Sequence, residues 1–303
     1  MPPTHPSCAH SSSDVYEYVE DYPRPTPHPD QVLVEIKYAA MNPCDFKMRR
    51  MDAPKFVADF LLPKPKISSE DLAGVVVAVG SAVTKFKVGD RVAGMLPILH
   101  TRWGAMAQFA AIKESAVALI PEAISFQEAA AVPLIAMTAV RGLDNLRGGT
   151  KGKRILIHAG AGGVGSFAVQ WCSKVLGMKV TSTSSAKNSA FLKELGAHEA
   201  IDYTTTDPLA NDPKYDVILD ALSYEYEPKT FGAGTIAVNP DGGHYLNIVG
   251  SDYALDADGQ EKGNGAVKMH TGPRHCLDVL GGSGMLRPSL ECSNPPLPYP
   301  RLC

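Results

Sequence analysis

The sequence predicts a two-domain α/β protein, in which a β-rich domain precedes a doubly wound parallel sheet. Three observations predict this fold class. Short apolar segments separated by glycines fill most of the first 124 residues, a glycine-rich turn follows an apolar segment at 154–158, and strand-like and helical segments then alternate up to residue 250. Short glycine-punctuated strands are typical of small barrels, whereas strands that alternate with helices form parallel β-α-β units.

The β-rich domain is predicted at 14–124. Residues 1–13 are rich in Pro and Ser, and we expect them to be a disordered lead-in. Apolar and β-branched clusters between glycines and prolines predict strands at 14–20, 31–38, 71–80, 86–94, 104–112 and 116–121. Four prolines from Pro23 to Pro29 predict an extended linker, and Asn42-Pro43 marks a turn after which a short helix can begin.

The α/β domain is predicted at 125–250. Ser125 and Glu128 form a capping-box pattern that opens a helical run at 129–146, which Pro133 interrupts. Strands are predicted at 154–158, 179–184, 199–203, 215–221 and 244–249. Beyond residue 250 the pattern predicts neither strand nor helix, so 251–303 is interpreted as a disordered tail or as a folded ending that has been lost or replaced.

The turn at 160–165 has the spacing G-x-G-x-x-G, directly between an apolar strand and a helical segment. In this context the first glycine permits a tight turn, the second lets the backbone approach a pyrophosphate, and the third lets the helix pack on the strand. Backbone N–H groups at a helix N-terminus hold the anion. We therefore predict a dinucleotide site whose turn consists of Gly160, Ala161, Gly162, Gly163, Val164 and Gly165.

Composition excludes several other classes of protein. The 303 residues contain 29 basic and 32 acidic side chains, which leaves no basic surface for nucleic acid or for an anionic membrane. No uninterrupted apolar stretch approaches the length of a membrane span. We expect a soluble protein with a small-molecule substrate and with neither nucleic acid nor membrane as a partner.

The cysteines and the N-terminus bear on the compartment. Six cysteines are scattered without C-x-x-C pairs, so neither a zinc knuckle nor a disulfide framework is predicted. The first residues lack a basic segment followed by an apolar core, which argues against a secretory signal and gives little transit-peptide character. The cytoplasm is the expected compartment, with mitochondria as the alternative.

Several segments in order, between about residues 15 and 250, resemble the medium-chain dehydrogenase/reductase superfamily, in its zinc-free branch of quinone oxidoreductases and enoyl reductases. The similar segments are 32–36, 41–45, 71–76, 88–92, 104–109, 129–139, 159–165, 195–197 and 201–203. The resemblance includes enzymes of the mitochondrial reticulon-interacting-protein type and fungal enoyl reductases. It implies a GroES-like catalytic domain, a Rossmann domain after it, and a substrate cleft between the two.

The resemblance also implies an activity, namely hydride transfer from reduced nicotinamide to a quinone or to an activated double bond. Asn42, at the expected cleft turn, is the candidate for orienting cofactor or substrate, and Lys47 is a candidate donor that is equally readable as a solvated surface residue. No catalytic acid is identifiable, so water is the expected proton source. His158 is interpreted as a core residue rather than a base.

The second strand of the α/β domain favours NADP(H). NAD sites place an acidic residue about 20 positions after the glycine turn, and none occurs there. The strand instead ends with Ser184, Ser185 and then Lys187, hydroxyls and a cation that suit a 2′-phosphate. The alternative is that the two serines only cap the next helix. The resemblance adds Tyr203 at the phosphate and Thr138 as a further cofactor contact.

No metal is expected. Zinc members of the superfamily use a cysteine near the Asn-Pro turn and a histidine beside an acidic residue. Cys44 lies close to the first position, but Glu70-Asp71 occupies the second. A catalytic zinc needs three protein ligands, and Cys44 is interpreted as a buried thiol.

The leading hypothesis is therefore a zinc-independent NADPH-dependent reductase of quinones or enoyl substrates. The alternative is a catalytically impaired, nucleotide-binding interaction protein with an incomplete catalytic domain, because the family's first strand and its returning C-terminal strands are not recognisable. The sequence patterns do not specify which quinone or enoyl compound is the substrate. Whether the protein is a homodimer is left open by the sequence, because in dimers of the family the pairing strand comes from the segment that follows residue 250.

Overall fold

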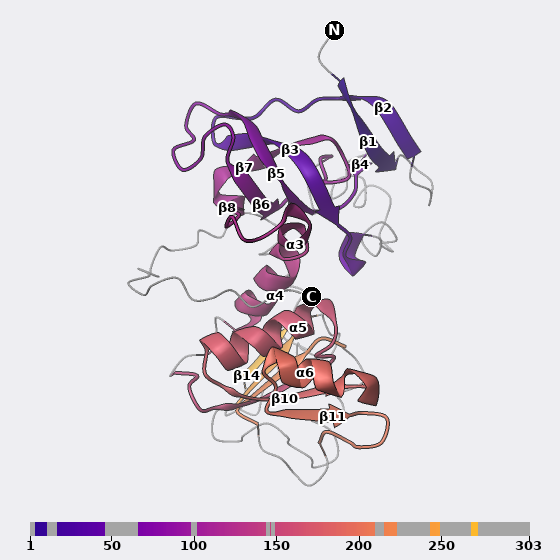
Figure 1. Ribbon diagram of the computed structural model, residues 1–303, viewed down its shortest axis with the longest axis vertical. Helices are drawn as coiled ribbons and strands as arrows, with labels where there is room; N and C mark the ends of the chain where they lie inside the picture. The colour runs from indigo at the N-terminus through magenta and orange to yellow at the C-terminus, as the bar shows by residue number, and fades with distance from the viewer. Residues whose placement is uncertain are drawn as a thin grey trace, which may run out of the picture. The chain divides into compact units, whose positions relative to one another are not determined.

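The computed structural model describes residues 4–10, 17–45, 66–97, 102–143, 146, 149–209, 215–222, 243–248 and 268–271 (Figure 1). The chain forms two compact units, the first running to Leu134 and the second beginning at Ile135. This division lies later than the boundary at 124/125 that the change of pattern predicts. The reason is that Ala129 and Ala130 pack with Ala73 and Ile120 in the core of the first unit.

The first unit contains a five-stranded antiparallel sheet in the order β7-β3-β5-β6-β8. The strands are β3 (Gln31–Ala40), β5 (Asp71–Val79), β6 (Arg91–Met95), β7 (Phe109–Lys113) and β8 (Val117–Leu119), and the short 3-10 helix η1 (Glu114–Ala116) precedes β8. Aliphatic side chains such as Val34, Leu72, Val76 and Val92 are completely buried in it. The sheet agrees with the β-rich domain that the sequence predicts.

A second, three-stranded sheet in the first unit has the order β2-β1-β4. Its strands are β1 (Thr4–His10), β2 (Glu17–Pro23) and β4 (Lys66–Ile67). β1 corrects the expectation of a disordered lead-in at residues 1–13. Pro6 lacks a backbone N–H, and the register between β1 and β2 shifts between His5 and Ser7, so that the strand accommodates the proline with a bulge.

Two helices follow the β-rich segment. α3 (Phe126–Ala130) begins with the predicted capping box: the Ser125 hydroxyl accepts from the Glu128 backbone N–H, and the Glu128 carboxylate accepts from the Ser125 backbone N–H. α4 (Pro133–Leu143) starts at the proline that the sequence identifies as an interruption. The boundary between the two units falls within α4.

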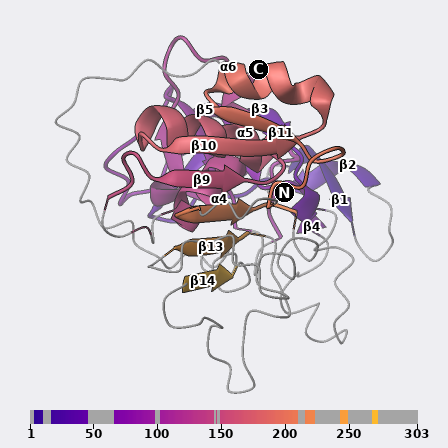
Figure 2. The ribbon, with the colours of Figure 1, turned by 90° about the horizontal axis from the view of Figure 1, so that it is seen from below.

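The second unit is built on a six-stranded sheet in the order β11-β10-β9-β12-β13-β14, with every neighbouring pair parallel. The strands are β9 (Arg154–Ile157), β10 (Lys179–Ser184), β11 (Glu199–Asp202), β12 (Val217–Asp220), β13 (His244–Asn247) and β14 (Lys268–Thr271). Several of them appear side by side in Figure 2. The strand order reverses between β9 and β12, and nucleotides bind at such a switch point. β14 lies in the region where the sequence predicts no strand.

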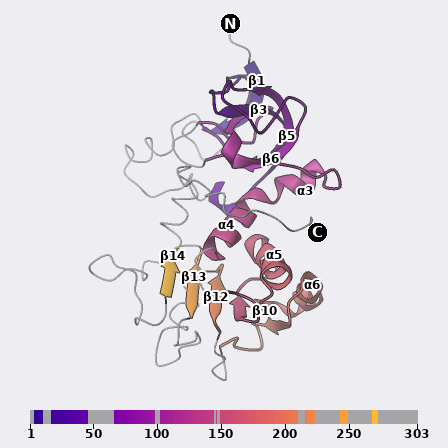
Figure 3. The same ribbon diagram turned by 90° about the vertical axis from the view of Figure 1, so that its left-hand side faces the viewer.

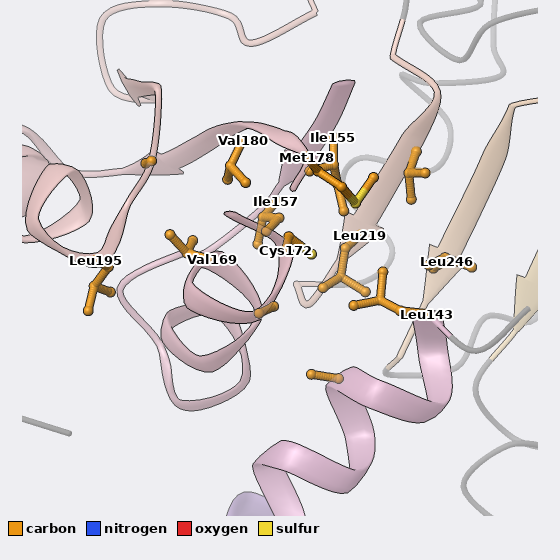
Figure 4. Close-up of a cluster of buried hydrophobic side chains, with 14 of the residues drawn as sticks. Leu143, Ile155, Ile157, Val169, Cys172, Met178, Val180, Leu195, Leu219 and Leu246 are labelled. Atoms are coloured by element: carbon orange, nitrogen blue, oxygen red, sulfur yellow. The ribbon is translucent and has the colours of Figure 1, made fainter. Parts of the chain in front are cut away.

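Helices cover the sheet of the second unit. α5 (Gly163–Gln170) continues into a π-helical turn, η2 (Trp171–Val175), while a 3-10 turn, η3 (Ala186–Asn188), precedes α6 (Ser189–Leu195). α5 and α6 lie on the same side of the sheet (Figure 3). Val169 and Cys172 meet Ile157, Leu219 and other buried side chains in the core of this unit (Figure 4). Among the described residues, no helix combines the length and the apolar character that a bilayer span requires.

Candidate functional site

The glycine turn joins the end of β9 to the start of α5, as the sequence predicts. Ala159 takes a left-handed conformation with φ of 53°, which is unusual for a residue with a side chain. The turn is tied to β10, because the backbone N–H of Gly160 donates to the Thr183 carbonyl at 3.0 Å and that of Ala159 to Thr183 Oγ1 at 3.2 Å. Gly162 is the N-cap residue of α5.

The glycines of the turn meet different surroundings. A Cβ on Gly165 would lie 2.2 Å from the Ala159 carbonyl oxygen, and one on Gly160 would lie 1.9 Å from Ser182 Oγ, so both positions are closed by neighbouring atoms. A Cβ on Gly162 would have only the Ala159 oxygen nearby, at 3.2 Å, and Gly162 and Gly163 are exposed. The outer side of the turn is therefore open, and the first N–H groups of α5 suit a pyrophosphate.

The predicted phosphate-binding residues gather where β10 and β11 end. Ser184 pairs in register with Asp202, and the Tyr203 backbone N–H donates to the Ser184 carbonyl at 3.2 Å. Ser185 and Lys187 follow β10 directly, with Lys187 exposed, and the Tyr203 side chain is 51% exposed. The fold therefore brings a cation and polar side chains from two neighbouring loops to one edge of the sheet.

The hydrogen bonds of Ser184 and Ser185 bear on the alternative that these two serines only cap the next helix. Ser185 is the N-cap residue of η3, yet its side chain makes no capping hydrogen bond. The buried Ser184 hydroxyl donates to the Ser185 carbonyl at 3.0 Å. Ser185 is thus better placed than Ser184 to offer its hydroxyl to a ligand.

Thr138 and His158 also belong to the second unit. Thr138 is half-buried on α4, three residues after Ile135 and hence on the same face of the helix. The Ile135 Cγ2 atom would lie 3.3 Å from a Cβ on Gly163, so this part of α4 runs beside the start of α5. His158 is fully buried at the end of β9, with Nδ1 3.5 Å from Thr183 Oγ1.

Asn42 lies in the first unit, after β3, and is held by two carboxylates. Its side-chain N–H donates to Asp71 Oδ2 at 2.9 Å, and its backbone N–H donates to Asp45 Oδ2 at 2.6 Å. Asp71 is completely buried, and its other oxygen accepts from the Leu134 backbone N–H at 2.9 Å. A side-chain amide has two N–H hydrogens and one oxygen, so this arrangement fixes the plane of the Asn42 amide while part of its hydrogen-bonding capacity stays available to a ligand.

The charges around Asn42 alter two pKa values. Burial raises the pKa of Asp71 to about 7, an effect that the hydrogen bonds from Asn42 and Leu134 oppose and the neighbouring Asp45 reinforces. Burial, followed by the charges of Asp45 and Asp71, raises the pKa of the Cys44 thiol to about 12. Cys44 is therefore a protonated thiol at neutral pH, and it is partly buried, where the sequence predicts a buried thiol. Lys47 lies outside the described residues.

A thiol and two carboxylates converge beside Asn42. Potential ligand atoms of Cys44, Asp45 and Glu70 all lie within 4.8 Å of one another. In the described part of the chain no imidazole joins this group. A thiol with hard carboxylate oxygens does not fit the cysteine and histidine pattern of the superfamily's zinc members.

Two hydrogen-bonded carboxylates, Asp71 in the first unit and Asp202 in the second, are not identified by the sequence patterns. Asp71 appears there only as the residue beside Glu70, and its two bonding partners are 29 and 63 positions away along the chain. Asp202 lies at the end of a predicted strand, and the Asp-x-Thr pattern that follows is a local turn signal that could have pointed to it.

The chain is similar to a known domain family and to several known proteins. The alcohol dehydrogenase GroES-like domain family matches residues 28–122. A 2-methylene-furan-3-one reductase from Solanum lycopersicum is 39% identical over 250 residues, which cover 80% of this chain and 61% of that protein. A chloroplastic quinone-oxidoreductase homologue from Spinacia oleracea is 38% identical, covering 70% of this chain and 67% of that protein. The chain belongs to the medium-chain dehydrogenase/reductase superfamily.

Within this superfamily, the chain belongs to the branch of quinone oxidoreductases and enoyl reductases. The quinone oxidoreductase from Coxiella burnetii has a TM-score of 0.68 at 29% identity, covering 79% of this chain and 74% of that one. The CurK enoyl reductase has a TM-score of 0.71 at 25% identity, covering 91% of this chain and 83% of that one. A mycobacterial protein solved in complex with NADPH has a TM-score of 0.68 at 25% identity, covering 88% and 81%.

Another superfamily member, the NADPH-dependent alkenal/one oxidoreductase of Arabidopsis thaliana, is 40% identical over 198 residues. These cover 64% of this chain and 50% of that protein. The chain thus spans between half and about two thirds of the length of these curated relatives.

Proposed function

We propose that this protein is an NADPH-dependent reductase that transfers hydride to a quinone or to an α,β-unsaturated carbonyl compound. The observation that carries the proposal is the open glycine turn at the switch point of a parallel sheet, next to a strand end that offers Ser185 and Lys187 instead of an acidic residue. Relatives named as reductases of quinones and alkenals support the substrate class.

The cofactor preference is assigned to four side chains. Ser184, Ser185, Lys187 and Tyr203 would surround the 2′-phosphate, while the N–H groups from Gly163 to Gly165 would hold the pyrophosphate and Thr138 would contact the cofactor from α4. A relative named as NADPH-dependent and the NADPH complex of a structural neighbour support NADP(H) over NAD(H).

When bound, reduced nicotinamide supplies the hydride. Asn42, held by Asp71 and Asp45, would orient the cofactor or the substrate with its remaining hydrogen-bonding groups. Reduction of an enone leaves negative charge on the carbonyl oxygen, which hydrogen-bond donors stabilise, and water would supply the proton. Lys47 is a second candidate donor.

The first unit also has a largely apolar groove, and Asn42 is not among the residues that line it. A groove of about 440 Å³ in the first unit is lined by Met41, next to Asn42, and by side chains that include Tyr18 and Met106. Such a surface would receive the hydrocarbon part of a quinone or an enone.

We propose that the reaction needs no zinc. The argument is that the group formed by Cys44, Asp45 and Glu70 lacks an imidazole among the described residues and that the Asp71 carboxylate is already bonded to Asn42 and Leu134. Activity that is unchanged after dialysis against a strong chelator, with no metal found by elemental analysis, is the expected result. Loss of activity that zinc restores would overturn this part of the proposal.

One assay tests the function. The purified protein is mixed with NADPH and a panel of quinones and enones, and oxidation is followed by nicotinamide absorbance. We expect turnover of at least one acceptor, with a lower KM for NADPH than for NADH. Lys187→Ala should raise the KM for NADPH about tenfold and leave that for NADH unchanged, because only NADPH carries the charge that Lys187 would meet. Tight NADPH binding without turnover of any acceptor would favour a nucleotide-binding interaction protein instead.

A further inference from the structure

The residue that precedes the glycine turn has a conformation that its side chain disfavours. Ala159 has a φ of 53°, in the left-handed region that residues with a Cβ rarely adopt. Such a conformation costs free energy and persists only where neighbouring groups hold it. The Ala159 carbonyl also accepts from the Gly162 backbone N–H at 2.9 Å, so this conformation sets the path of the turn up to the start of α5. Whatever holds Ala159 therefore also directs the first N–H groups of that helix.

Thr183, in β10, holds Ala159 in place. Its Oγ1 atom accepts from the Ala159 backbone N–H at 3.2 Å, and its carbonyl oxygen accepts from the Gly160 backbone N–H at 3.0 Å. The hydroxyl's own hydrogen is left for His158 Nδ1, which lies 3.5 Å from Thr183 Oγ1. Thr183 is completely buried, so water does not compete for these hydrogen bonds. One residue of β10 thus bonds two successive N–H groups at the entry of the turn.

The Thr183 hydroxyl is the part of this arrangement that depends on a side chain. The hydrogen bond from Gly160 goes to the backbone of β10, and any residue at position 183 would offer that carbonyl. The hydrogen bond from Ala159 needs a side-chain acceptor, which valine, of nearly the same shape as threonine, lacks. The Ser182 hydroxyl is engaged elsewhere, because it donates to the Ile157 carbonyl at 2.9 Å. Loss of the Thr183 hydroxyl would therefore leave the Ala159 N–H without its acceptor.

We propose that Thr183 is a positioning residue for the cofactor's pyrophosphate, because its hydroxyl holds Ala159 and with it the glycine turn. This inference rests on the proposed cofactor site. Thr183 itself does not touch the cofactor, since its side chain is completely buried. NADPH and NADH both carry the pyrophosphate, so Thr183 contributes to the affinity for both, whereas Lys187 is assigned to the 2′-phosphate that only NADPH carries.

The test compares Thr183→Val, which removes the acceptor, with Thr183→Ser, which keeps it, in the full chain. The Kd values of NADPH and NADH are measured by fluorescence titration. Adenosine 2′-monophosphate, which has the 2′-phosphate without the pyrophosphate, is measured by its displacement of NADPH. Thr183→Val should weaken both dinucleotides by the same factor, about fivefold, and change the Kd of adenosine 2′-monophosphate less than about twofold. Thr183→Ser should stay within about twofold of the unaltered protein for all three ligands.

Thr181→Val is the matched control. Thr181 lies two residues earlier in β10 and therefore on the same face of the sheet, and it is also buried. Its hydroxyl donates to Glu199 Oε2 at 3.2 Å, in the neighbouring strand β11, and not to the turn. The same substitution in the same strand should lower the melting temperature about as much as Thr183→Val does and leave the three Kd values unchanged.

The outcomes separate a positioning role from a general one. If the unaltered protein binds both dinucleotides and Thr183→Val binds them as tightly, the role of Thr183 is overturned. Equal weakening of all three ligands, or the same weakening in Thr183→Ser or Thr181→Val, indicates general damage to the fold and also overturns it. A loss confined to NADPH would assign Thr183 to the 2′-phosphate instead. If the unaltered protein binds neither dinucleotide, the proposed cofactor site itself is wrong, and the role of Thr183 is wrong with it.

Discussion

Asp71 is the residue on which most of the order around Asn42 depends. It is completely buried at the start of β5 and accepts from the Asn42 side chain and from the Leu134 backbone at the start of α4. Both hydrogen bonds favour the ionised carboxylate, while burial disfavours it more strongly, so that its pKa is raised to about 7. The protein thus retains a carboxylate that is costly to bury, because its two oxygens position two other groups.

This pKa predicts how stability depends on pH. The folded protein holds the Asp71 proton up to a pH of about 7, whereas the unfolded chain releases it near the ordinary aspartate pKa of 3.8. Since the folded state binds the proton more tightly, the contribution to stability is present below the unfolded pKa. It is lost as the pH rises through about 7, at about 1.4 kcal/mol per pH unit within this window.

Asp71→Asn should remove this slope. The asparagine side chain offers one oxygen in place of two, so either the Asn42 side-chain N–H or the Leu134 backbone N–H loses its acceptor. A buried donor without an acceptor costs about 1–3 kcal/mol of stability at every pH. The difference in the free energy of unfolding between the two proteins, measured in urea from pH 4 to 8, should therefore shrink as the pH rises and then change sign, because the unaltered protein loses more over this range than the substitution costs. Asp90→Asn is the control, since Lys87 lowers the pKa of Asp90 and its titration lies below this window. A constant difference across the range would contradict the raised pKa.

At the scale of elements, substitutions at two glycines of the turn should affect different properties, namely stability at Gly165 and NADPH affinity at Gly162. Gly165→Ala places a Cβ against the backbone of Ala159 and Gly160, which cannot yield, and it should destabilise the protein by about 1–3 kcal/mol.

The Cβ that Gly162→Ala adds meets only one oxygen, at 3.2 Å, so the melting temperature should fall by about 4 °C or less. The added methyl group faces the proposed pyrophosphate position, and NADPH affinity should fall about tenfold. A Gly162→Ala protein that binds NADPH normally would contradict this placement.

The elements that the sequence predicts well are those with local signals. The strand, turn and helix around the glycine turn and the capping box at Ser125 each lie within a few residues, and the structure has them where the pattern predicts them. β1 and β14 were not predicted, because β1 contains Pro6 and pairs on one side with the distant β4, while β14 pairs with β13, about 20 residues earlier in the chain. The contacts of Asp71 are likewise tertiary, so no local pattern could indicate them.

At the scale of the whole molecule, each unit has its own core, with Ile155, Ile157 and Leu219 completely buried in the second unit and Val32, Val34 and Leu72 completely buried in the first. All proposed phosphate contacts belong to the second unit, and the boundary lies within α4. A ligand present at a hundred times its Kd stabilises the state that binds it by about 2.7 kcal/mol. We therefore expect unequal protection when NADPH binds.

Hydrogen exchange measured with and without NADPH should show the largest protection in peptides covering 159–165, 183–187 and 202–206, and little in peptides from β3 and β5. NADH at the same multiple of its own Kd should protect 159–165 equally, because both cofactors carry the pyrophosphate, and should protect 185–187 less, because it lacks the 2′-phosphate. Equal protection of both units would contradict this prediction, since binding would then order the molecule as one cooperative whole. Equal protection of 185–187 by both cofactors would instead contradict the 2′-phosphate site, because only a contact specific to NADPH distinguishes the two ligands there.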